Sequence, residues 1–246
     1  MVVGSVDIND KGCTVILKER VLVSKTLLIY MKIVLNEIFN EIKNGNNLGE
    51  KITLVGATKF VDVERINKAI NLGLTDVGEN KAQEFRDKFD KLLPCNYHFF
   101  GRLQKNKIKY LVGKVFLIHS VDSIELISEI NKKSKELNVT TNILIEVNFG
   151  EEQKGGVLVD YLPTLLQESK NYKNVCVKGL MAVMENTENQ QLLIENYKNL
   201  RKLYDKYKEE YNFEYLSAGM SNDYKIAINN GANMIRIGSL IFGSRY

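Results

Sequence analysis

Short apolar runs alternate with amphipathic segments along most of the chain, and this alternation predicts the fold. Eight runs rich in β-branched and aromatic residues have the length of strands, at 52–57, 75–78, 97–100, 115–118, 142–147, 175–183, 213–216 and 233–237. Apolar runs without inside–outside alternation are typical of parallel strands buried on both faces. Eight strand–helix units favour a single (β/α)8 TIM-type barrel, with an open doubly wound α/β sheet as the alternative.

Helix start and stop signals lie between these runs. Asp62 precedes a segment that carries Ile66 on its apolar face, and Gly73 follows it as a C′ residue. Asp122 and Glu125 have the spacing of a capping box, which predicts a helix after the fourth strand. A long helix is expected at 190–211, where one stripe carries Leu193, Tyr197, Leu200, Tyr204 and Tyr207.

The chain before the first strand divides into two parts. From Met31 onward, apolar residues fall roughly at helical spacing and predict an N-terminal helix; they are Ile33, Leu35, Ile38, Phe39 and Ile42. Residues 1–30 lack a small-residue cleavage site, so they do not have the pattern of a signal peptide. We expect residues 1–30 to be an extension outside the core, or a misassigned start, and residues 31–246 to form the barrel domain.

Composition narrows the class of protein. A length of 246 residues suits one large domain, and the net charge of +4 is too small for a dedicated nucleic-acid binder. Three scattered cysteines give neither a disulfide framework nor a zinc site, so we expect a reducing cytoplasm and no metal. There is no run of about 18 apolar residues, so no membrane span is predicted.

Candidate chemistry lies where the expected strands end, because barrel active sites form on the loops after the strands. Lys59 follows the first strand in the segment Gly56–Lys59 and would point into the barrel mouth. Partial desolvation there lowers an ammonium pKa and makes the amine nucleophilic, as Schiff-base chemistry requires. A solvated lysine at a strand end is the alternative.

The next three strand ends carry weaker candidates. Glu79 could orient a lysine, and Asn80 could offer its amide to a ligand or cap the following helix. His98 and His119, the two histidines of the chain, lie near the ends of the third and fourth strands. Structural histidines are favoured over a role at the barrel mouth. The basic residues from Arg102 onward have the pattern of a solvated helix face.

The last two strand ends predict a phosphate site. Ser221, Gly238 and Ser239 lie on the loops after the seventh and eighth strands, which form the usual phosphate cradle of this fold. Arg236 lies two residues before Gly238, so the two share one face of the strand. A phosphate at these loops, an imine at Lys59 and the arginine would bracket a pyridine ring. Ordinary turn chemistry, and an arginine paired with a structural carboxylate, are the alternatives.

Taken together, these residues make the chain resemble the pyridoxal phosphate homeostasis proteins, relatives of the N-terminal barrel of alanine racemase. The matching blocks are LVGATK (54–59), GENKAQE (78–84), HFFGRLQKNK (98–107), HSVDS (119–123), QKGG (153–156), GLM (179–181), SAGMSND (217–223) and RIGSLIFG (236–243). Ala218 departs from the methionine that the family often has there. The resemblance implies an alanine racemase N-terminal-domain-like barrel that binds pyridoxal 5'-phosphate as a Schiff base on Lys59.

The family analogy also assigns the remaining cofactor contacts. It places Asn80 near the cofactor, Met220 at its edge, and Arg236 at the pyridine nitrogen. It places three residues at the phosphate: Ser221, Gly238 and Ser239. A guanidinium donates a hydrogen bond but not its proton, so the ring would be a weak electron sink.

We therefore expect a non-catalytic carrier without catalytic residues. The second acid/base of alanine racemase comes from a β domain, and this chain ends about where the barrel closes. The expected role is intracellular storage and delivery of pyridoxal phosphate by a monomer, with PLP-dependent apo-enzymes as partners. A PLP-dependent amino-acid racemase and a Schiff-base aldolase are the alternatives.

Overall fold

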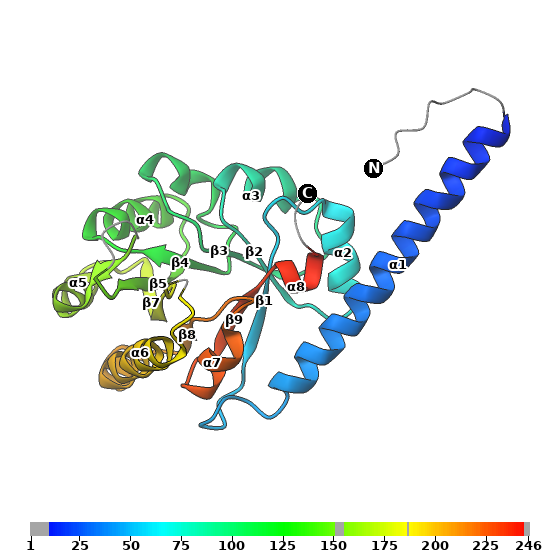
Figure 1. Ribbon diagram of the computed structural model, residues 1–246. Helices are drawn as coiled ribbons and strands as arrows, with labels where there is room; N and C mark the ends of the chain where they lie inside the picture. Colours follow the sequence, from blue (N-terminus) through cyan, green and yellow to red (C-terminus); the bar gives the residue numbers. More distant parts are fainter. Residues whose placement is uncertain (1–9, 151–154, 186, 244–246) are drawn as a thin grey trace.

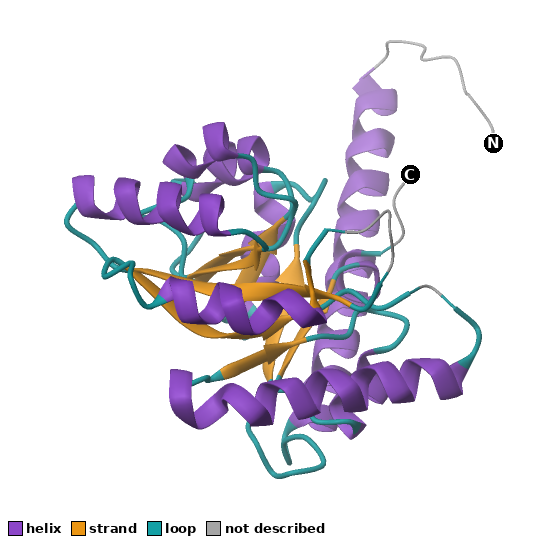
Figure 2. Cartoon of the chain, turned by 90° about the vertical axis from the view of Figure 1, so that its left-hand side faces the viewer, coloured by secondary structure: helices purple, strands orange, loops and turns teal. Residues whose placement is uncertain are grey.

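The computed structural model describes residues 10–150, 155–185 and 187–243, with side chains from residue 26 onward. Eight parallel strands close into a barrel, because β4 pairs with β5 as well as with β3. Helices surround it on the outside (Figures 1 and 2). The barrel strands are β1 (Thr53–Ala57), β2 (Asp76–Glu79), β3 (Asn96–Phe99), β4 (Leu117–Val121), β5 (Thr141–Asn148), β7 (Val175–Met181), β8 (Tyr215–Ser217) and β9 (Met234–Ile237). The predicted (β/α)8 barrel and its eight strands are confirmed.

The connecting elements follow the expected order, with one addition. The two-residue strand β6 (Val157–Leu158) pairs with the end of β5 and was not predicted, because two residues carry no periodicity. The helical elements are α1 (Asp10–Ile42), α2 (Val63–Asn71), α3 (Ala82–Phe89), the 3-10 helix η1 (Lys105–Tyr110), α4 (Ile124–Glu136), the 3-10 helix η2 (Val159–Tyr161), α5 (Leu162–Ser169), α6 (Gln190–Tyr211), α7 (Tyr224–Asn229) and α8 (Ser239–Phe242).

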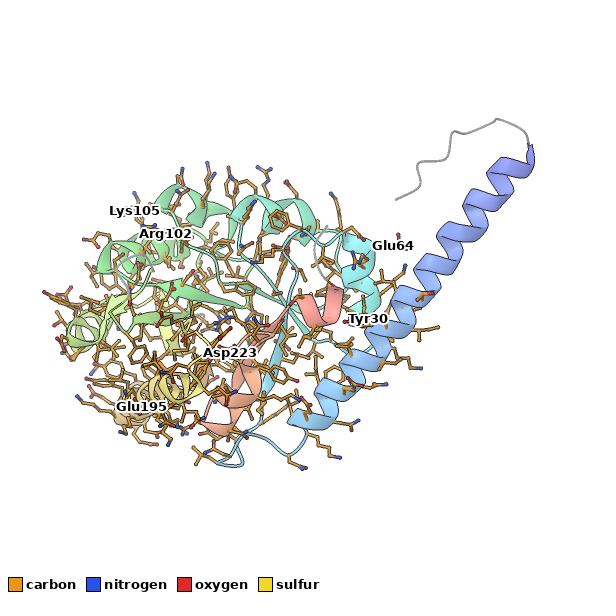
Figure 3. The ribbon with its side chains drawn as sticks, in the orientation of Figure 1. Tyr30, Glu64, Arg102, Lys105, Glu195 and Asp223 are labelled. Atoms are coloured by element: carbon orange, nitrogen blue, oxygen red, sulfur yellow. The ribbon has the colours of Figure 1, made fainter. Side chains whose placement is uncertain are left out.

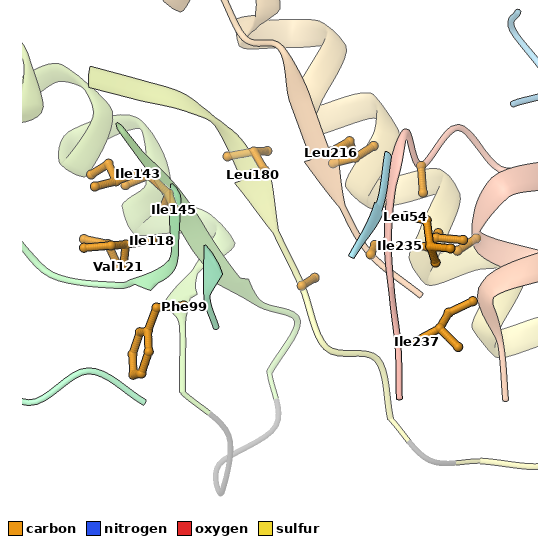
Figure 4. Packing of buried hydrophobic residues seen from close by; sticks show 14 of the residues in the cluster. Leu54, Phe99, Ile118, Val121, Ile143, Ile145, Leu180, Leu216, Ile235 and Ile237 are labelled. Atoms are coloured by element: carbon orange, nitrogen blue, oxygen red, sulfur yellow. The ribbon is translucent and has the colours of Figure 1, made fainter. Parts of the chain in front are cut away.

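Side chains on the strands serve two separate layers. Outward-facing residues such as Leu54, Ile235 and Ile237 pack in the layer between the strands and the helices (Figure 4). A second, smaller apolar cluster consists of buried residues that alternate with these: Val55, Leu117, Leu144, Met181 and Met234. Arg236 shares the inward face of β9 with Met234 because side chains alternate along a strand.

Most helix boundaries follow the sequence signals. The Asp62 carboxylate accepts a hydrogen bond from the Arg65 backbone N–H at 2.8 Å, and Gly73 has a φ of +103° after α2. Helix α6 has the predicted bounds, and all five residues of its predicted stripe are buried. The capping box at Asp122 and Glu125 was wrong: Ser123 holds the N-cap position, and Asp122 instead accepts from the Gly156 N–H at 3.4 Å. The Asp122 carboxylate therefore points toward the loop after β5 and not toward the first turn of α4.

Helix α1 begins at Asp10, well before the pattern that starts at Met31. Met31, Leu35 and Ile38 are buried against the barrel, whereas Ile33 is 52% exposed, because a residue two positions after Met31 faces away. The first turns of α1 extend beyond the barrel (Figure 1). Tyr30, labelled in Figure 3, donates to the Leu240 carbonyl of α8 at 3.0 Å. The predicted boundary between residues 1–30 and 31–246 thus falls inside one continuous helix and stays a prediction.

Two expected absences concern the part of the chain that is described. Within it, no helix combines the length and apolar composition needed to cross a membrane. The same residues contain no cluster of three or more histidine, cysteine or acidic side chains suited to a metal, and Cys95 and Cys176 are free thiols. Cys13 lies outside the described side chains.

One ion cluster joins α6 to the segment that enters β1. The Glu50 carboxylate pairs with both terminal nitrogens of Arg201 at 2.5 and 3.0 Å, and accepts from Lys208 at 3.0 Å and Asn46 at 2.9 Å. Arg201 also donates to the Gly231 carbonyl at 3.0 Å. The hydrogen bonds from Arg201 lower the pKa of Glu50 to about 2, against the opposing effect of burial.

Glu50→Gln is expected to destabilise the protein at neutral pH by about 2–3 kcal/mol, because a pKa depression in the folded state is a stability contribution. That contribution is present above the unfolded pKa of 4.5 and is lost as the pH falls toward 2. Urea unfolding at pH 7 and pH 3 measures it, with the exposed Glu209→Gln as control. An unchanged difference between wild type and Glu50→Gln at the two pH values would contradict this account.

Candidate functional site

A cavity of about 450 Å³ opens at the carboxyl ends of the strands. Its walls include apolar residues such as Ala57, Phe100 and Val183. The structure brings together in its lining all seven of the residues predicted from the sequence: Lys59, Asn80, Met220, Ser221, Arg236, Gly238 and Ser239. They come from the ends of four neighbouring strands, β2, β1, β9 and β8, so the pairing of β1 with β9 brings residues from both ends of the chain together.

The backbone on either side of Lys59 is held in place. Thr58 donates its N–H to the Gly78 carbonyl at 2.9 Å, and its carbonyl accepts from the Lys88 ammonium at 2.9 Å. The N–H of Phe60 donates to the Glu84 carboxylate at 2.9 Å. Phe60 has a φ of +62°, an uncommon conformation for a residue with a side chain. These contacts fix the turn from which Lys59 enters the cavity.

Lys88 connects these contacts into an ion cluster with two carboxylates. Its ammonium lies 2.6 Å from Glu79 and 3.0 Å from Glu84. Glu79 is fully buried, burial raises its pKa, and Thr58 donates to the same oxygen at 2.8 Å. The expectation that Glu79 orients a lysine is met by Lys88, a residue that the sequence did not single out.

Asn80 lies in the cavity wall and does not cap the following helix. The N-cap residue of α3 is Lys81, so the capping alternative was wrong. The buried side-chain oxygen of Asn80 has no hydrogen-bond partner among the described residues. Gly101 packs directly on this residue: a Cβ there would lie 1.8 Å from the Asn80 carbonyl oxygen. An unsatisfied polar atom in a cavity wall favours a polar ligand.

The loop after β8 is shaped by Asp223, labelled near the middle of Figure 3. One carboxylate oxygen accepts from the Met220 N–H at 2.7 Å, and the other accepts from the Tyr197 hydroxyl of α6 at 2.6 Å. These bonds hold Ser221 at the cavity. On the neighbouring loop, a Cβ at Gly238 would lie 3.0 Å from the Ala57 carbonyl, so glycine keeps the backbone open to a ligand.

Arg236 lies at the floor of the cavity and is 4% exposed. It donates to the Ser217 hydroxyl at 2.6 Å and to the Ala182 carbonyl at 3.0 Å. Its predicted alternative, pairing with a structural carboxylate, is not among the contacts of its guanidinium that the structure gives. His98 and His119 lie behind Ser217 and are fully buried with partners on both ring nitrogens, which confirms the structural interpretation.

Other predicted positions lie apart from the cavity. Arg102 and Lys105, labelled in Figure 3, are exposed and do not line the cavity, in agreement with a solvated face. Ala218 is fully buried and does not line the cavity. Gln153 and Lys154 of the QKGG block lie outside the described residues. Lys88, Tyr197 and Ser217 were missed because they lie behind the cavity lining: Ser217 contacts Arg236, Tyr197 contacts Asp223, and Lys88 contacts the carbonyl of Thr58 next to Lys59.

Known proteins similar to this chain share its fold and much of its sequence. The profile of the family "Alanine racemase, N-terminal domain" matches residues 48–246. A pyridoxal phosphate homeostasis protein of Aquifex aeolicus is 45% identical over 197 residues, which are 78% of this chain and 86% of the relative. The protein of the same name from Schizosaccharomyces pombe is 35% identical and covers 86% of this chain and 91% of its own.

Solved structures agree with this similarity. PipY of Synechococcus elongatus without PLP has a TM-score of 0.74 and 27% identity, covering 78% of this chain and 93% of its own. A structure of the same protein with PLP bound has a TM-score of 0.77 and 24% identity, covering 87% of this chain and all of its own. The barrel fold is therefore that of PipY, one of whose structures contains PLP.

Proposed function

The chain belongs to the alanine racemase N-terminal domain family, and on that basis we propose that it binds pyridoxal 5'-phosphate and takes part in its homeostasis. The finer proposal is that it stores and delivers the cofactor, held as a Schiff base on Lys59, and catalyses no reaction of its own. The names of its relatives support the homeostasis role.

One structural observation carries the proposal: a lysine, a buried arginine and two small-residue loops line the same cavity. The Lys59 amine would add to the cofactor aldehyde and release water. Ser221, Gly238 and Ser239 would hold the phosphate through hydroxyl and backbone N–H groups. Asn80, whose buried oxygen lacks a described partner, would bond a polar ring substituent.

Arg236 would face the pyridine nitrogen, and Met220, which is 40% exposed, would cover an edge of the ring. When bound, the cofactor supplies an aldehyde for imine formation and a ring that can act as an electron sink. The guanidinium stays charged even though burial lowers the pKa of Arg236, so it offers the ring nitrogen a hydrogen bond and no transferable proton. The pyridine ring is then a weaker electron sink, which favours a carrier over an enzyme.

The cavity lining also bears on the racemase alternative. Racemisation needs an acid/base on each face of the ring. Besides Lys59, the described lining contains neither tyrosine nor histidine, and its carboxylates are Glu185 and Asp223. Asp223 already accepts hydrogen bonds from the Met220 N–H and the Tyr197 hydroxyl. An aldolase would use Lys59 on a sugar phosphate and would carry no coloured cofactor. The proposed carrier would work in the cytoplasm as a monomer, with PLP-dependent apo-enzymes as recipients.

Borohydride reduction of the pyridoxal phosphate-loaded protein, followed by peptide mass mapping, tests the proposal. We expect a pyridoxyl adduct on the Lys59 peptide, a visible absorption band before reduction, and loss of both in Lys59→Ala. Lys81→Ala is the matched control, because this neighbouring lysine lies over the Phe60 ring at 4.5 Å and does not line the cavity. An adduct elsewhere would refute the assignment, and steady amino-acid racemisation abolished in Lys59→Ala would refute the carrier role.

A further inference from the structure

Five hydrogen-bonded polar side chains cross the barrel interior, and we call them the polar relay: Arg236, Ser217, His119, His98 and Asp76. Arg236 donates to the Ser217 hydroxyl at 2.6 Å, and that hydroxyl lies 3.0 Å from His119 Nδ1. His119 Nε2 lies 2.9 Å from His98 Nδ1, and His98 Nε2 lies 3.0 Å from the Asp76 carboxylate. Its members come from five strands, namely β9, β8, β4, β3 and β2.

The polar relay is isolated from water. Ser217, His119 and His98 are fully buried, and Arg236 and Asp76 are 4% and 6% exposed. Burying polar groups costs free energy unless each is hydrogen-bonded, and bonds in such a dry environment polarise one another. Apolar residues could fill the same part of the barrel interior, as they do in the smaller apolar cluster around Val55 and Leu117. Packing alone therefore does not explain why these buried positions are polar.

The donors and acceptors of the polar relay allow its hydrogen bonds to run in one direction. Thr75 and Asn96 donate to Asp76 at 2.6 and 3.0 Å, and these bonds with that from His98 lower the pKa of Asp76 although burial opposes them. An ionised carboxylate only accepts, so His98 donates from Nε2 and accepts at Nδ1. Because His98 Nδ1 is an acceptor, His119 donates to it from Nε2.

The hydroxyl of Ser217 completes this direction. It donates to the bare Nδ1 of His119 and accepts from Arg236. Every hydrogen bond then points from the guanidinium toward the carboxylate.

The two charges of the polar relay are at its ends. Burial lowers the pKa of both His98 and His119, and the neighbouring charge of Arg236 lowers that of His119 further, so both rings are neutral. The groups that also act electrostatically on Arg236 are Tyr197, Glu146 and Asp223. The Asp76 charge in turn adds to the rise that burial causes in the pKa of Cys95 and of Tyr215.

We propose that Asp76 is a positioning residue for the cofactor site: through the polar relay it fixes the orientation of the Arg236 guanidinium. One terminal nitrogen is committed to Ser217 and the other to Ala182, so the guanidinium plane cannot rotate. Its consequence for the ligand rests on the proposed function, because it sets the hydrogen bond offered to the pyridine nitrogen. Asp76 acts without touching the cavity, whose described lining does not include it.

The first test needs no cofactor. The chain has two histidines, so 15N labelling of histidine gives NMR signals of two imidazoles. We expect both rings to be neutral and protonated at Nε2, so no assignment is needed. A ring protonated at Nδ1, alone or in addition, at neutral pH would overturn the direction of the polar relay. This result is independent of whether the protein binds pyridoxal phosphate.

The second test measures the cofactor site from its far end. Asp76→Asn keeps an acceptor but removes the charge, and we expect a shifted absorption maximum and about tenfold weaker binding of pyridoxal phosphate. Tyr97→Phe is the control, a buried neighbour on β3 whose hydroxyl has no partner among the described residues. An unchanged spectrum and Kd in folded Asp76→Asn would overturn the proposal.

Two further outcomes can be distinguished from these: Asp76→Asn does not fold, or the wild-type protein does not bind pyridoxal phosphate. If Asp76→Asn does not fold, Ser217→Ala interrupts the polar relay at a small residue, and the same shift is expected; an unchanged spectrum again overturns the proposal. If the wild-type protein binds no pyridoxal phosphate, the proposed function fails, and the NMR result alone decides whether the polar relay has the stated direction.

Discussion

Replacing Lys88 by methionine is expected to destabilise the folded protein by about 3–5 kcal/mol at neutral pH, the usual cost of leaving a buried charge unpaired. Lys88 is the ammonium within ion-pair distance of the fully buried Glu79, at 2.6 Å, and its own side chain is 12% exposed. The second oxygen of Glu79 already lacks a hydrogen-bond partner among the described residues. Without Lys88, the carboxylate would keep the hydrogen bond from the Thr58 hydroxyl, which carries no charge to compensate its own.

The pH dependence identifies the cause. Burial raises the pKa of Glu79 in the folded state, and loss of Lys88 removes the interactions that oppose this rise. Stability contributed by a group with a raised folded pKa is present below its unfolded value and is lost as the pH rises through the folded value. Lys88→Met should therefore regain stability on acidification. Urea unfolding at several pH values measures this.

Matched variants separate charge from packing in this prediction. Lys91→Met, at an exposed position just after α3, should change stability by less than about 0.5 kcal/mol. Glu79→Gln in the Lys88→Met background should recover much of the loss, because the unpaired charge is gone. If the double variant is no more stable than Lys88→Met, the loss does not come from an unpaired Glu79. The two variants that carry Lys88→Met should retain pyridoxal phosphate poorly, since Lys88 holds the Thr58 carbonyl beside Lys59.

Gly101→Ala is expected to cost about 3 kcal/mol of stability and to abolish retention of pyridoxal phosphate. A Cβ at this position would lie 1.8 Å from the Asn80 carbonyl oxygen and 2.5 Å from its carbon, and a backbone cannot yield as a flexible side chain does. Either the end of β2 or the loop after β3 must move. Both carry residues of the cavity wall, namely Asn80 and Phe100.

Thermal unfolding and equilibrium dialysis with pyridoxal phosphate measure the two effects. Gly49→Ala is the control: it has a φ of +77° but no atom within 4 Å of the added Cβ, so backbone strain of about 1 kcal/mol is its only cost. Its cofactor retention should equal that of the wild type. Wild-type retention in Gly101→Ala would show that the contact with Asn80 does not shape the site.

Periodicity and residue type predicted the strands, because strand runs buried on both faces are apolar throughout and their ends are marked by glycine and polar residues. They also predicted six of the cavity residues, since in a parallel barrel a residue after any strand end lies at the same rim, and the family resemblance added Met220. Helix α6 was predicted to the residue because its apolar stripe is long and its caps are polar. The Asp122 capping box failed because a nearby backbone N–H, Gly156, competes for the carboxylate.

The sequence sufficed for what depends on local pattern: the barrel, its order of strands, and which residues face its mouth. Closure of the barrel decided the rest, because partners such as Asp76 and Arg236 are separated by most of the chain and become linked only through strands from its middle. No spacing rule connects Lys88 to the turn at Lys59, or His98 and His119 to Ser217. Hydrogen-bond direction and burial, which set the charge of each group, are properties of the folded interior rather than of any segment.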